Sequence, residues 1–255
     1  MGNRGFHGFS SSQMRSSPGY WPASYPVQGS NLLMWLDAGA ITGLNDDDPI
    51  ASWPDNAGLA TVAQSNNTYR PVYKTGIAAG RPVARFAFGK YMTIADFAPG
   101  ANPTVMWVAY NGTQNAASSI HKPILAGITD PYVASTTSWG WGYLRQGSNG
   151  VSAVQSSGDN LTLTRTQSNA FEVYTFYKVS TTGYIAINQV DPLATGTSYN
   201  SVGGNPNGYW LGGQTSDASR RYTGDIAELL VWSTSLSAEE RLYMQIALMG
   251  KYNIP

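Results

Sequence analysis

The C-terminal residues 222–255 constrain the fold of this chain more than any other stretch. Residues 226–232 read Ile-Ala-Glu-Leu-Leu-Val-Trp, a nearly continuous apolar run that is typical of a buried strand. Ser237 is followed three residues later by Glu240, and this spacing is the capping box that begins a helix. Gly250 marks the expected end of that helix. A buried strand, a tight turn and one short helix therefore end a chain that is otherwise poor in helical patterns.

The expected C-terminal helix also carries an apolar stripe. Leu242, Ile246 and Met249 recur at helical spacing, with Tyr243 and Ala247 beside them. Because such a stripe normally packs against a protein core, the sequence predicts that this face of the helix is buried.

Composition agrees with a large β-rich domain and excludes several classes of protein. The chain has 255 residues, with 28 Gly, 16 Tyr and 8 Trp and only 12% charged residues, which suits many short strands joined by tight turns. The formal net charge is zero and the sequence lacks a basic run, so nothing indicates nucleic-acid binding. The adjacent basic pair Arg220 and Arg221 is expected to lie in a solvated loop. Cysteine is absent, and neither a signal peptide nor an apolar run long enough to insert in a membrane is seen.

Several short motifs, taken in order, resemble those of laminin-G-like, concanavalin-A-like jelly-roll domains. The segment 224–232 followed by 235–240 looks like the family's last strand and helix, and residues 33–38 look like its first strand. Residues 53–58 read Trp-Pro-Asp-Asn-Ala-Gly and look like its Trp-x-Asp-x-x-Gly turn, in which Asp55 is expected to cap the turn through its side chain. Arg-Pro at 70–71 and Val-Ala-Arg-Phe at 83–86 fit the same order. The resemblance covers residues 31–255 and implies an all-β, two-sheet antiparallel jelly-roll sandwich with one short C-terminal helix.

The remaining strands are expected from local patterns. Residues 83–87 and 91–94 indicate a hairpin or two sequential strands, and residues 171–179 with 184–188 look like the family's central hairpin. Further strands are expected at 104–110, 124–128 and 138–144, whereas 201–213 reads as a loop rich in Gly and Asn.

Residues 1–30 are expected to form an extended N-terminal arm, separate from the domain at 31–255. Pro18, Pro22 and Pro26 disfavour regular structure. One reading is a disordered tail. The preferred reading is an anchor that docks on copies of the same chain or on a larger assembly, through aromatic residues. These anchoring residues are Phe6, Phe9, Tyr20, Trp21 and Tyr25.

Calcium is the one ion for which the sequence offers candidate ligands, and no cofactor is expected to be required. Asp46 and Asp48 lie in a polar loop with Asp47 between them, and hard cations prefer clustered oxygen ligands. The spacing is not that of an EF-hand, and three consecutive aspartates cannot all face one ion.

The sequence predicts a protein without catalytic activity. Glycoside hydrolysis requires two carboxyl groups about 5 to 9 Å apart, and related glucanases carry them on one strand as Glu-x-Asp-x-x-Glu. That motif is absent from this chain, whose glutamates are Glu172, Glu228, Glu239 and Glu240. His7 lies in the arm and His121 in an expected loop, so neither begins a triad or a metal cluster.

Two groups of residues are candidates for binding carbohydrate, because sugars stack their apolar faces on aromatic rings and bind polar side chains through their hydroxyls. The first group is Trp139, Trp141 and Tyr143, which alternate along an expected strand; the alternative is that these residues line the core. The second group is Tyr209 and Trp210, expected to be exposed in a loop, together with Asn205 and Asn207.

The preferred function is a non-catalytic bacteriophage virion surface protein, namely a capsid decoration, head-fibre or tail component. A small module without cysteine or export signal suits assembly in the host cytoplasm, and the arm suits attachment to other virion proteins or to copies of itself in an oligomer or lattice. Such a protein could also bind host-surface glycans. The alternative is an extracellular carbohydrate-binding or adhesion module cut from a longer secreted bacterial protein.

Overall fold

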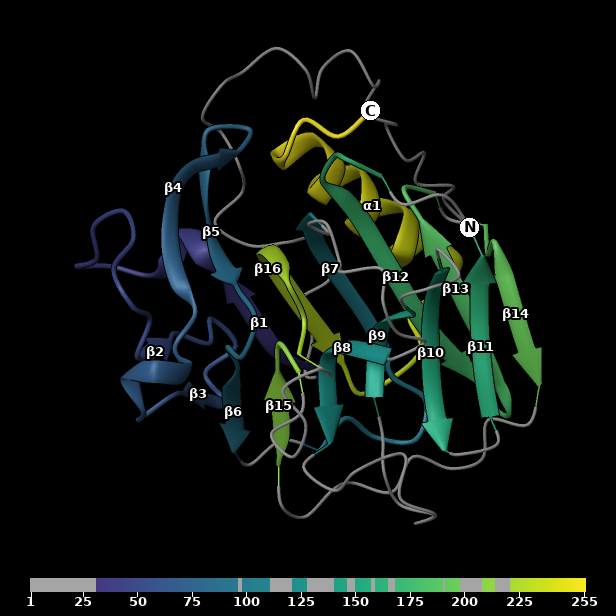
Figure 1. Cartoon of the computed structure of the whole chain (residues 1–255). Helices are drawn as coiled ribbons and strands as arrows, with labels where there is room; N and C mark the ends of the chain where they lie inside the picture. The colour runs from purple at the N-terminus through teal and green to yellow at the C-terminus, as the bar shows by residue number, and fades with distance from the viewer. Residues whose placement is uncertain are drawn as a thin grey trace, which may run out of the picture.

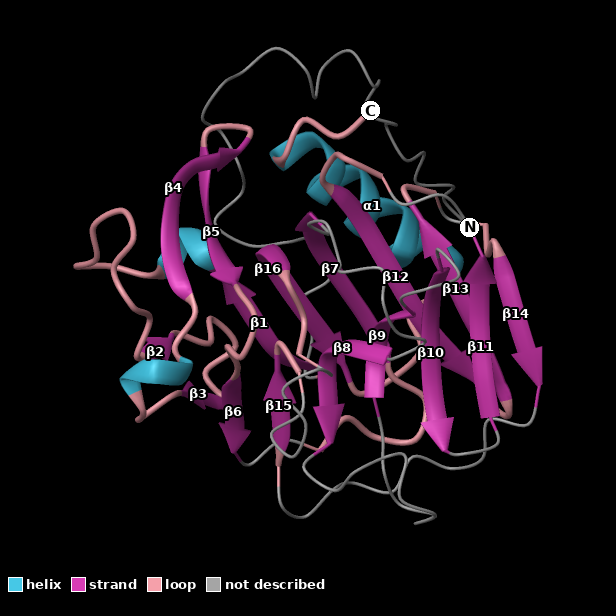
Figure 2. Cartoon of the chain, viewed as in Figure 1, coloured by secondary structure: helices cyan, strands magenta, loops and turns pink. Residues whose placement is uncertain are grey.

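The chain folds into an all-β sandwich of two antiparallel sheets, with an α-helix near the C-terminus (Figures 1 and 2). This confirms the fold class expected from the sequence. The structure is a computed structural model that describes residues 31–95, 98–110, 121–127, 140–145, 150–156, 159–164, 168–189, 191–197, 208–213 and 221–255.

The first sheet contains the buried C-terminal strand that the sequence predicts. Its order is β14 (Ala194–Thr197), β13 (Thr182–Ile187), β12 (Glu172–Val179), β7 (Thr104–Tyr110), β16 (Gly224–Trp232), β5 (Arg81–Phe86) and β4 (Val72–Ala78). Strand β1 (Leu32–Asp37) also pairs with the C-terminal half of β16. All nine residues of β16 are buried, as the apolar run predicts.

The second sheet has the order β11 (Asp159–Thr164), β10 (Gly150–Ser156), β9 (Gly140–Arg145), β8 (His121–Gly127), β15 (Tyr209–Leu211), β6 (Met92–Ala95), β3 (Thr61–Ala63) and β2 (Ser52–Trp53). Strands β5 and β6 are therefore sequential strands in different sheets rather than a hairpin. The chain passes from one side of the sandwich to the other between them.

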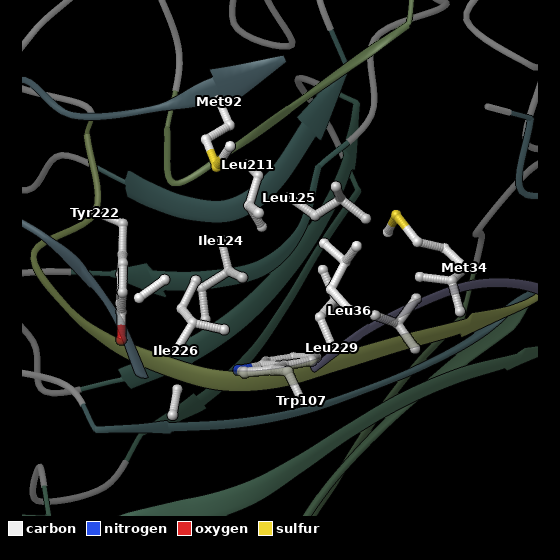
Figure 3. Close-up of a cluster of buried hydrophobic side chains, with 14 of the residues drawn as sticks. Met34, Leu36, Met92, Trp107, Ile124, Leu125, Leu211, Tyr222, Ile226 and Leu229 are labelled. Atoms are coloured by element: carbon white, nitrogen blue, oxygen red, sulfur yellow. The ribbon is translucent and has the colours of Figure 1, made fainter. Parts of the chain in front are cut away.

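The main core lies between the two sheets and follows strand alternation. On β7, Val105, Trp107 and Ala109 face the opposite sheet, whereas Met106 and Val108 face the helix. Figure 3 shows inward-pointing side chains from both sheets meeting in this core. Burying each large apolar side chain contributes roughly 1.5–3 kcal/mol, so this interface is the main source of stability.

A β-bulge in β16 decides where its glutamate points. Pairing with β7 steps from Ile226 opposite Ala109 directly to Glu228 opposite Val108, so Ala227 is an extra residue. Ile226 faces the core between the sheets, and Glu228 faces the helix side. Without the bulge, Glu228 would share the face of Ile226 and its carboxylate would lie among apolar side chains.

Helix α1 (Ala238–Lys251) covers the outer face of the first sheet (Figure 1). The predicted capping box is confirmed, because the Ser237 amide donates to Glu240 Oε2 at 2.8 Å and the Glu240 amide donates to Ser237 Oγ at 3.2 Å. Met244 and Leu248 pack on outward-facing residues of the first sheet. Among the residues that the structure describes, no helix is long and apolar enough to cross a membrane.

The predicted orientation of this helix is wrong. Leu242, Tyr243 and Ile246 face solvent, with 41%, 44% and 38% of their surface exposed. The buried face instead combines apolar and polar side chains: Arg241, Met244, Gln245, Leu248 and Lys251. The polar members are buried because partners lie beneath them. Arg241 packs over the Tyr177 ring with its Cζ 3.7 Å from the ring centroid, and the Gln245 amide donates to Thr175 Oγ1 at 3.1 Å.

A buried charge cluster joins the end of α1 to β16 and β1. Lys251 Nζ donates to Glu228 Oε2 and to Asp37 Oδ2, each at 2.7 Å. Glu228 also accepts hydrogen bonds from the Tyr252 hydroxyl at 2.8 Å and from Trp35 Nε1 at 2.7 Å. The carboxylate of Glu228 is fully buried, so these donors replace the water that it loses on folding.

Asp55 caps its turn as predicted and also ties the turn to β1. Its carboxylate accepts hydrogen bonds from four backbone amides: Trp35 at 2.7 Å, Ala57 at 3.0 Å, Leu59 at 2.9 Å and Ala60 at 2.8 Å. Trp53 is buried in the core, and Gly58 adopts a φ of 74°, which L-residues rarely adopt. The Trp-x-Asp-x-x-Gly motif thus supplies a core anchor, an acceptor for four amides and a turn glycine.

Tyr222 gives the protein a specific sensitivity to alkaline pH. Its side chain is fully buried in the core (Figure 3). Its hydroxyl donates a hydrogen bond to the Tyr110 carbonyl at 2.9 Å. Burial, followed by the nearby Asp225, raises the pKa of Tyr222 well above its usual value near 10. The folded state therefore favours the neutral phenol. The contribution of Tyr222 to the stability of the fold is fully present below pH 10, and it is lost as the pH rises from 10 toward the pKa of the folded state.

We expect Tyr222→Phe to lower the free energy of unfolding by about 1 kcal/mol at pH 8, through the lost hydrogen bond. Above pH 10 the decline of stability with pH should be shallower than in the parent, by up to about 1.4 kcal/mol per pH unit. Urea unfolding between pH 8 and 12 measures both effects. Tyr243→Phe, at an exposed position, is the matched control and should leave the slope unchanged. Equal slopes in parent and Tyr222→Phe would contradict the assignment.

Candidate functional site

An aromatic side chain stands on the outer face of the second sheet where β6 begins. Along β6, Met92 and Ile94 are buried in the core between the sheets, and Thr93 is exposed on the opposite face. Tyr91 precedes Met92, so alternation places it on the same outer face as Thr93. Its side chain is partly exposed.

A second tyrosine comes from the short 3-10 helix η2 (Asn67–Tyr69). The side chain of Asn66 caps this helix by accepting a hydrogen bond from the Thr68 amide at 2.9 Å. The Tyr91 amide donates to the Tyr69 carbonyl at 2.9 Å, which fixes the two residues beside each other. Their ring centroids lie 5.3 Å apart with an angle of 33° between the planes. Both residues are partly exposed.

Trp210 lies beside these tyrosines in β15. It pairs with Thr93 on β6 and with Ala126 on β8, in the middle of the second sheet. Its ring meets that of Tyr91 edge-on, with centroids 6.4 Å apart. Only 6% of Trp210 is exposed. It therefore supports Tyr91 rather than forming an open surface itself.

Arg221 completes the group. Its Cζ lies 4.9 Å from the centroid of the Tyr91 ring and 5.1 Å from that of Tyr69, within the range of cation–π contacts. Its Nη1 donates to the Gly89 carbonyl. The expectation that Arg221 lies solvated is wrong, because two aromatic rings bury it. We call Tyr69, Tyr91, Trp210 and Arg221 the aromatic cluster.

Polar groups surround the aromatic cluster. The Gln64 amide donates to the Tyr91 carbonyl at 3.1 Å, and Gln64 Oε1 accepts from the Asn66 amide at 3.0 Å. Lys90 Nζ donates to the Thr68 carbonyl at 2.8 Å. The cluster thus combines the rings of two partly exposed residues with the neighbouring ammonium group of Lys90, whereas Gln64 is buried and its amide ties the surrounding backbone together.

The prediction that Tyr209 and Trp210 are exposed is wrong. Both belong to β15, which lies between β6 and β8 in the interior of the sheet. Tyr209 is fully buried in the core. Gly212, directly after the strand, adopts a φ of 81°, and a Cβ there would come within 2.2 Å of Phe86. A residue with a side chain would therefore not fit at position 212.

Several other predicted site residues remain predictions. Trp141 and Tyr143 lie in β9, where Trp141 pairs with Leu125 and Tyr143 with Pro123 of β8. Trp139, Asn205 and Asn207 lie outside the described residues, as do the arm residues Phe6, Phe9, Tyr20, Trp21 and Tyr25.

The aspartates proposed for calcium are held by protein donors. Asp46 pairs with Lys74 Nζ and also accepts from the Thr75 amide at 2.8 Å. The hydrogen bond from Lys74, followed by that from Thr75, lowers the pKa of Asp46 below its usual value. Asp48 Oδ2 accepts from the backbone amide and side-chain amide of Asn45, at 2.6 and 3.2 Å. Within the described residues, no three side chains of the ligating types gather around one point. A calcium ion would therefore have to displace these donors.

The carboxylates that the structure brings together serve structural roles. Asp37 and Glu228 meet at Lys251, but the fully buried Glu228 is out of reach of any substrate. Glu172 is buried and accepts from the Tyr174 hydroxyl at 2.7 Å. His121, expected in a loop, begins β8.

A shallow surface pocket of about 360 Å³ lies elsewhere and is lined by small residues and Val179, without an acidic side chain. None of these groups forms an accessible pair of carboxyls.

Sequence reasoning missed Tyr69, Tyr91 and Arg221 as a group. One signal was present: Tyr91 begins an alternating run in which Met92 and Ile94 are the core positions, so it falls on the outer face. The other members come from separate segments of the chain. Nothing local to Tyr69 or Arg221 indicates that the three side chains meet.

No protein-family model and no curated protein sequence matches this chain. Solved structures do match. Domain 4 of AbnA, a GH43 extracellular arabinanase from Geobacillus stearothermophilus solved in complex with arabinotriose, has a TM-score of 0.56 at 15% identity. This similarity covers 85% of the chain and 98% of that domain.

Two further structures share the fold over part of their length. Trypanosoma rangeli sialidase in complex with the inhibitor DANA has a TM-score of 0.58 at 10% identity, over 92% of this chain and 36% of the sialidase. The binding domain of botulinum neurotoxin serotype D has a TM-score of 0.57 at 12% identity, over 86% of this chain and 51% of that domain. At these identities the similarity establishes the β-sandwich fold, consistent with the jelly roll that the motifs indicate.

Proposed function

We propose that this chain is a non-catalytic carbohydrate-binding β-sandwich module, and that the aromatic cluster is its sugar-binding surface. The observation that carries the proposal is the packed pair of rings from the partly exposed residues Tyr69 and Tyr91, held by Arg221 and supported by Trp210. The fold adds support, because domain 4 of the arabinanase, which is similar over nearly its whole length, was solved in complex with arabinotriose.

The physical basis is that the cluster is rigid before a ligand arrives. The backbone hydrogen bond between Tyr91 and Tyr69 and the contact of Arg221 with both rings fix their orientation. Binding to fixed rings loses little side-chain conformational entropy, which favours affinity. The neighbouring Asn66, Asn67 and Thr68 provide donors and acceptors for hydroxyl groups.

An extracellular location accompanies this proposal, since the matching arabinanase is described as extracellular. The virion surface role, with partners bound through residues 1–30, rests on sequence features alone and stays a prediction. No observation on the described residues favours it over a carbohydrate-binding module.

We expect Tyr91→Ala to weaken glycan binding at least tenfold, or about 1.4 kcal/mol, because the variant loses a stacking ring and uncovers Trp210. The full chain is first screened on a glycan array that includes arabinotriose, with calcium and with a chelator. The affinity of parent and variant for the best glycan is then measured by calorimetry. Loss of binding in chelator would show that the site also requires an ion.

The matched control is Tyr184→Ala. Tyr184 is also a partly exposed tyrosine in an aromatic pair, stacked on Tyr177 at 4.7 Å, but it lies in the first sheet. This variant should bind as the parent does. An array without any bound glycan would overturn the proposed function, and equal weakening by both substitutions would overturn the assignment to the aromatic cluster.

A further inference from the structure

The solvent-facing side of α1 is apolar in a way that its packing does not explain. Leu242, Tyr243 and Ile246 are all more than one third exposed. Isolated exposed apolar residues are ordinary, but a continuous stripe along one helix face indicates an interaction surface. We call these three residues the outer stripe.

The chain that precedes the described domain begins beside this helix. The Asn31 carbonyl accepts a hydrogen bond from the Ser233 amide at 2.8 Å, just before α1. Leu32 belongs to the same apolar cluster as Leu236, just before α1, and as Met244 and Leu248 on the buried face of the helix. Residues 1–30 are therefore attached to the domain at the edge of α1.

The composition of residues 1–30 complements the outer stripe. The segment contains five aromatic residues: Phe6, Phe9, Tyr20, Trp21 and Tyr25. Its charged side chains are Arg4 and Arg15, whereas the exposed Glu239 lies one helical turn before Leu242 and Tyr243. The aromatic side chains of the segment can therefore pack on the apolar outer stripe, and its arginines can pair with Glu239.

Length does not limit this contact. The 14 residues of α1 span about 21 Å at 1.5 Å per residue. An extended chain advances roughly 3.3 Å per residue, so fewer than about ten residues would cross the whole helix. Intramolecular attachment also gives the segment an effective concentration near the millimolar range, which favours binding to its own domain over a second copy at low concentration.

We propose that the aromatic residues of segment 1–30 bind across the outer stripe of α1 in the same chain. The arm then acts as a cover for its own helix rather than as an anchor on another subunit. This inference is independent of the proposed glycan binding, because it concerns the outer side of the first sheet.

Limited trypsin digestion of the full chain tests the proposal. Arg4 and Arg15 are the cleavage sites within the segment, and the next basic residue is Arg70, so the products are simple to identify by intact mass. We expect cleavage after Arg15 to be at least tenfold faster in the double variant Leu242→Ser, Ile246→Ser than in the parent. Leu59→Ser is the matched control, because Leu59 is 58% exposed and belongs to the Asp55 turn rather than to α1. It should be cleaved at the parent rate.

Thermal unfolding of each variant shows whether the domain remains folded, and exposed positions of this kind usually change stability little. The parent is also digested over a hundredfold dilution. If cleavage after Arg15 stays slow on dilution, the segment binds within one chain. Protection that disappears on dilution would overturn the proposal in favour of contact between two copies. Equal cleavage rates in the parent and the double variant would overturn it outright.

Discussion

Lys251→Met is expected to lower the free energy of unfolding by about 3–5 kcal/mol. The substitution keeps the size of the side chain but removes the cation that pairs with both Glu228 and Asp37 at 2.7 Å. Glu228 is fully buried, so its carboxylate would lose its counter-ion without gaining water. The Tyr252 and Trp35 hydrogen bonds alone cannot neutralise that charge. Urea denaturation, followed by tryptophan fluorescence, measures the loss as a fall in the midpoint.

Lys74→Met is the matched control, since it also removes a lysine shared by two carboxylates. Its partners Asp46 and Asp47 are exposed to water, with side-chain exposures of 45% and 71%, so only a small loss of stability is expected. The double substitution Glu228→Gln, Lys251→Met should recover part of the loss, because it no longer leaves a buried charge. If Lys251→Met cost no more than Lys74→Met, the buried pair would not be a main support of the fold.

Asp55→Ala is expected to lower the free energy of unfolding by about 2–4 kcal/mol, because four backbone amides lose their charged acceptor. One of the four, the Trp35 amide, belongs to β1, so the loss should loosen the attachment of the turn to the first sheet. Asp55→Asn keeps one oxygen acceptor and should fall between the parent and Asp55→Ala. Thermal and urea unfolding of the three proteins give the order.

Asp48→Ala is the control for this second prediction. Asp48 also accepts hydrogen bonds in a turn, but both come from the single neighbouring residue Asn45. Its removal should cost about 1 kcal/mol or less, as for a helix or turn cap near the surface. A loss in Asp55→Ala no larger than that in Asp48→Ala would mean that the link to β1 contributes little.

Local patterns predicted the elements that depend on neighbouring residues. The capping box at Ser237 and Glu240 and the Asp55 turn form through hydrogen bonds made largely within a few residues. The apolar run of β16 and the buried strand β7 are evident because nearly every position is apolar. The two-residue β2 and three-residue β3 were missed, since strands so short show no clear alternation.

Patterns failed where burial depends on residues that are distant in sequence. The stripe of Leu242 and Ile246 is regular, yet the opposite helix face is buried, because Thr175, Tyr177 and Glu228 lie beneath it as partners for polar side chains. Tyr209 and Trp210 looked exposed among glycines, but pairing with β6 and β8 encloses them. The aromatic cluster could not be predicted as a unit for the same reason.

By itself, the sequence determined the C-terminal strand and helix and the Asp55 turn, because hydrogen bonds and apolar spacing within short segments suffice to specify them. The class of the fold followed from the order of motifs that resemble those of jelly-roll domains. The tertiary structure alone decided which face of α1 is buried, where Glu228 points and which aromatic rings gather near solvent. Those outcomes depend on a bulge that shifts strand register and on pairings between distant segments. The burial of a side chain is a property of its neighbours, and in a sandwich of two sheets most neighbours come from elsewhere in the chain.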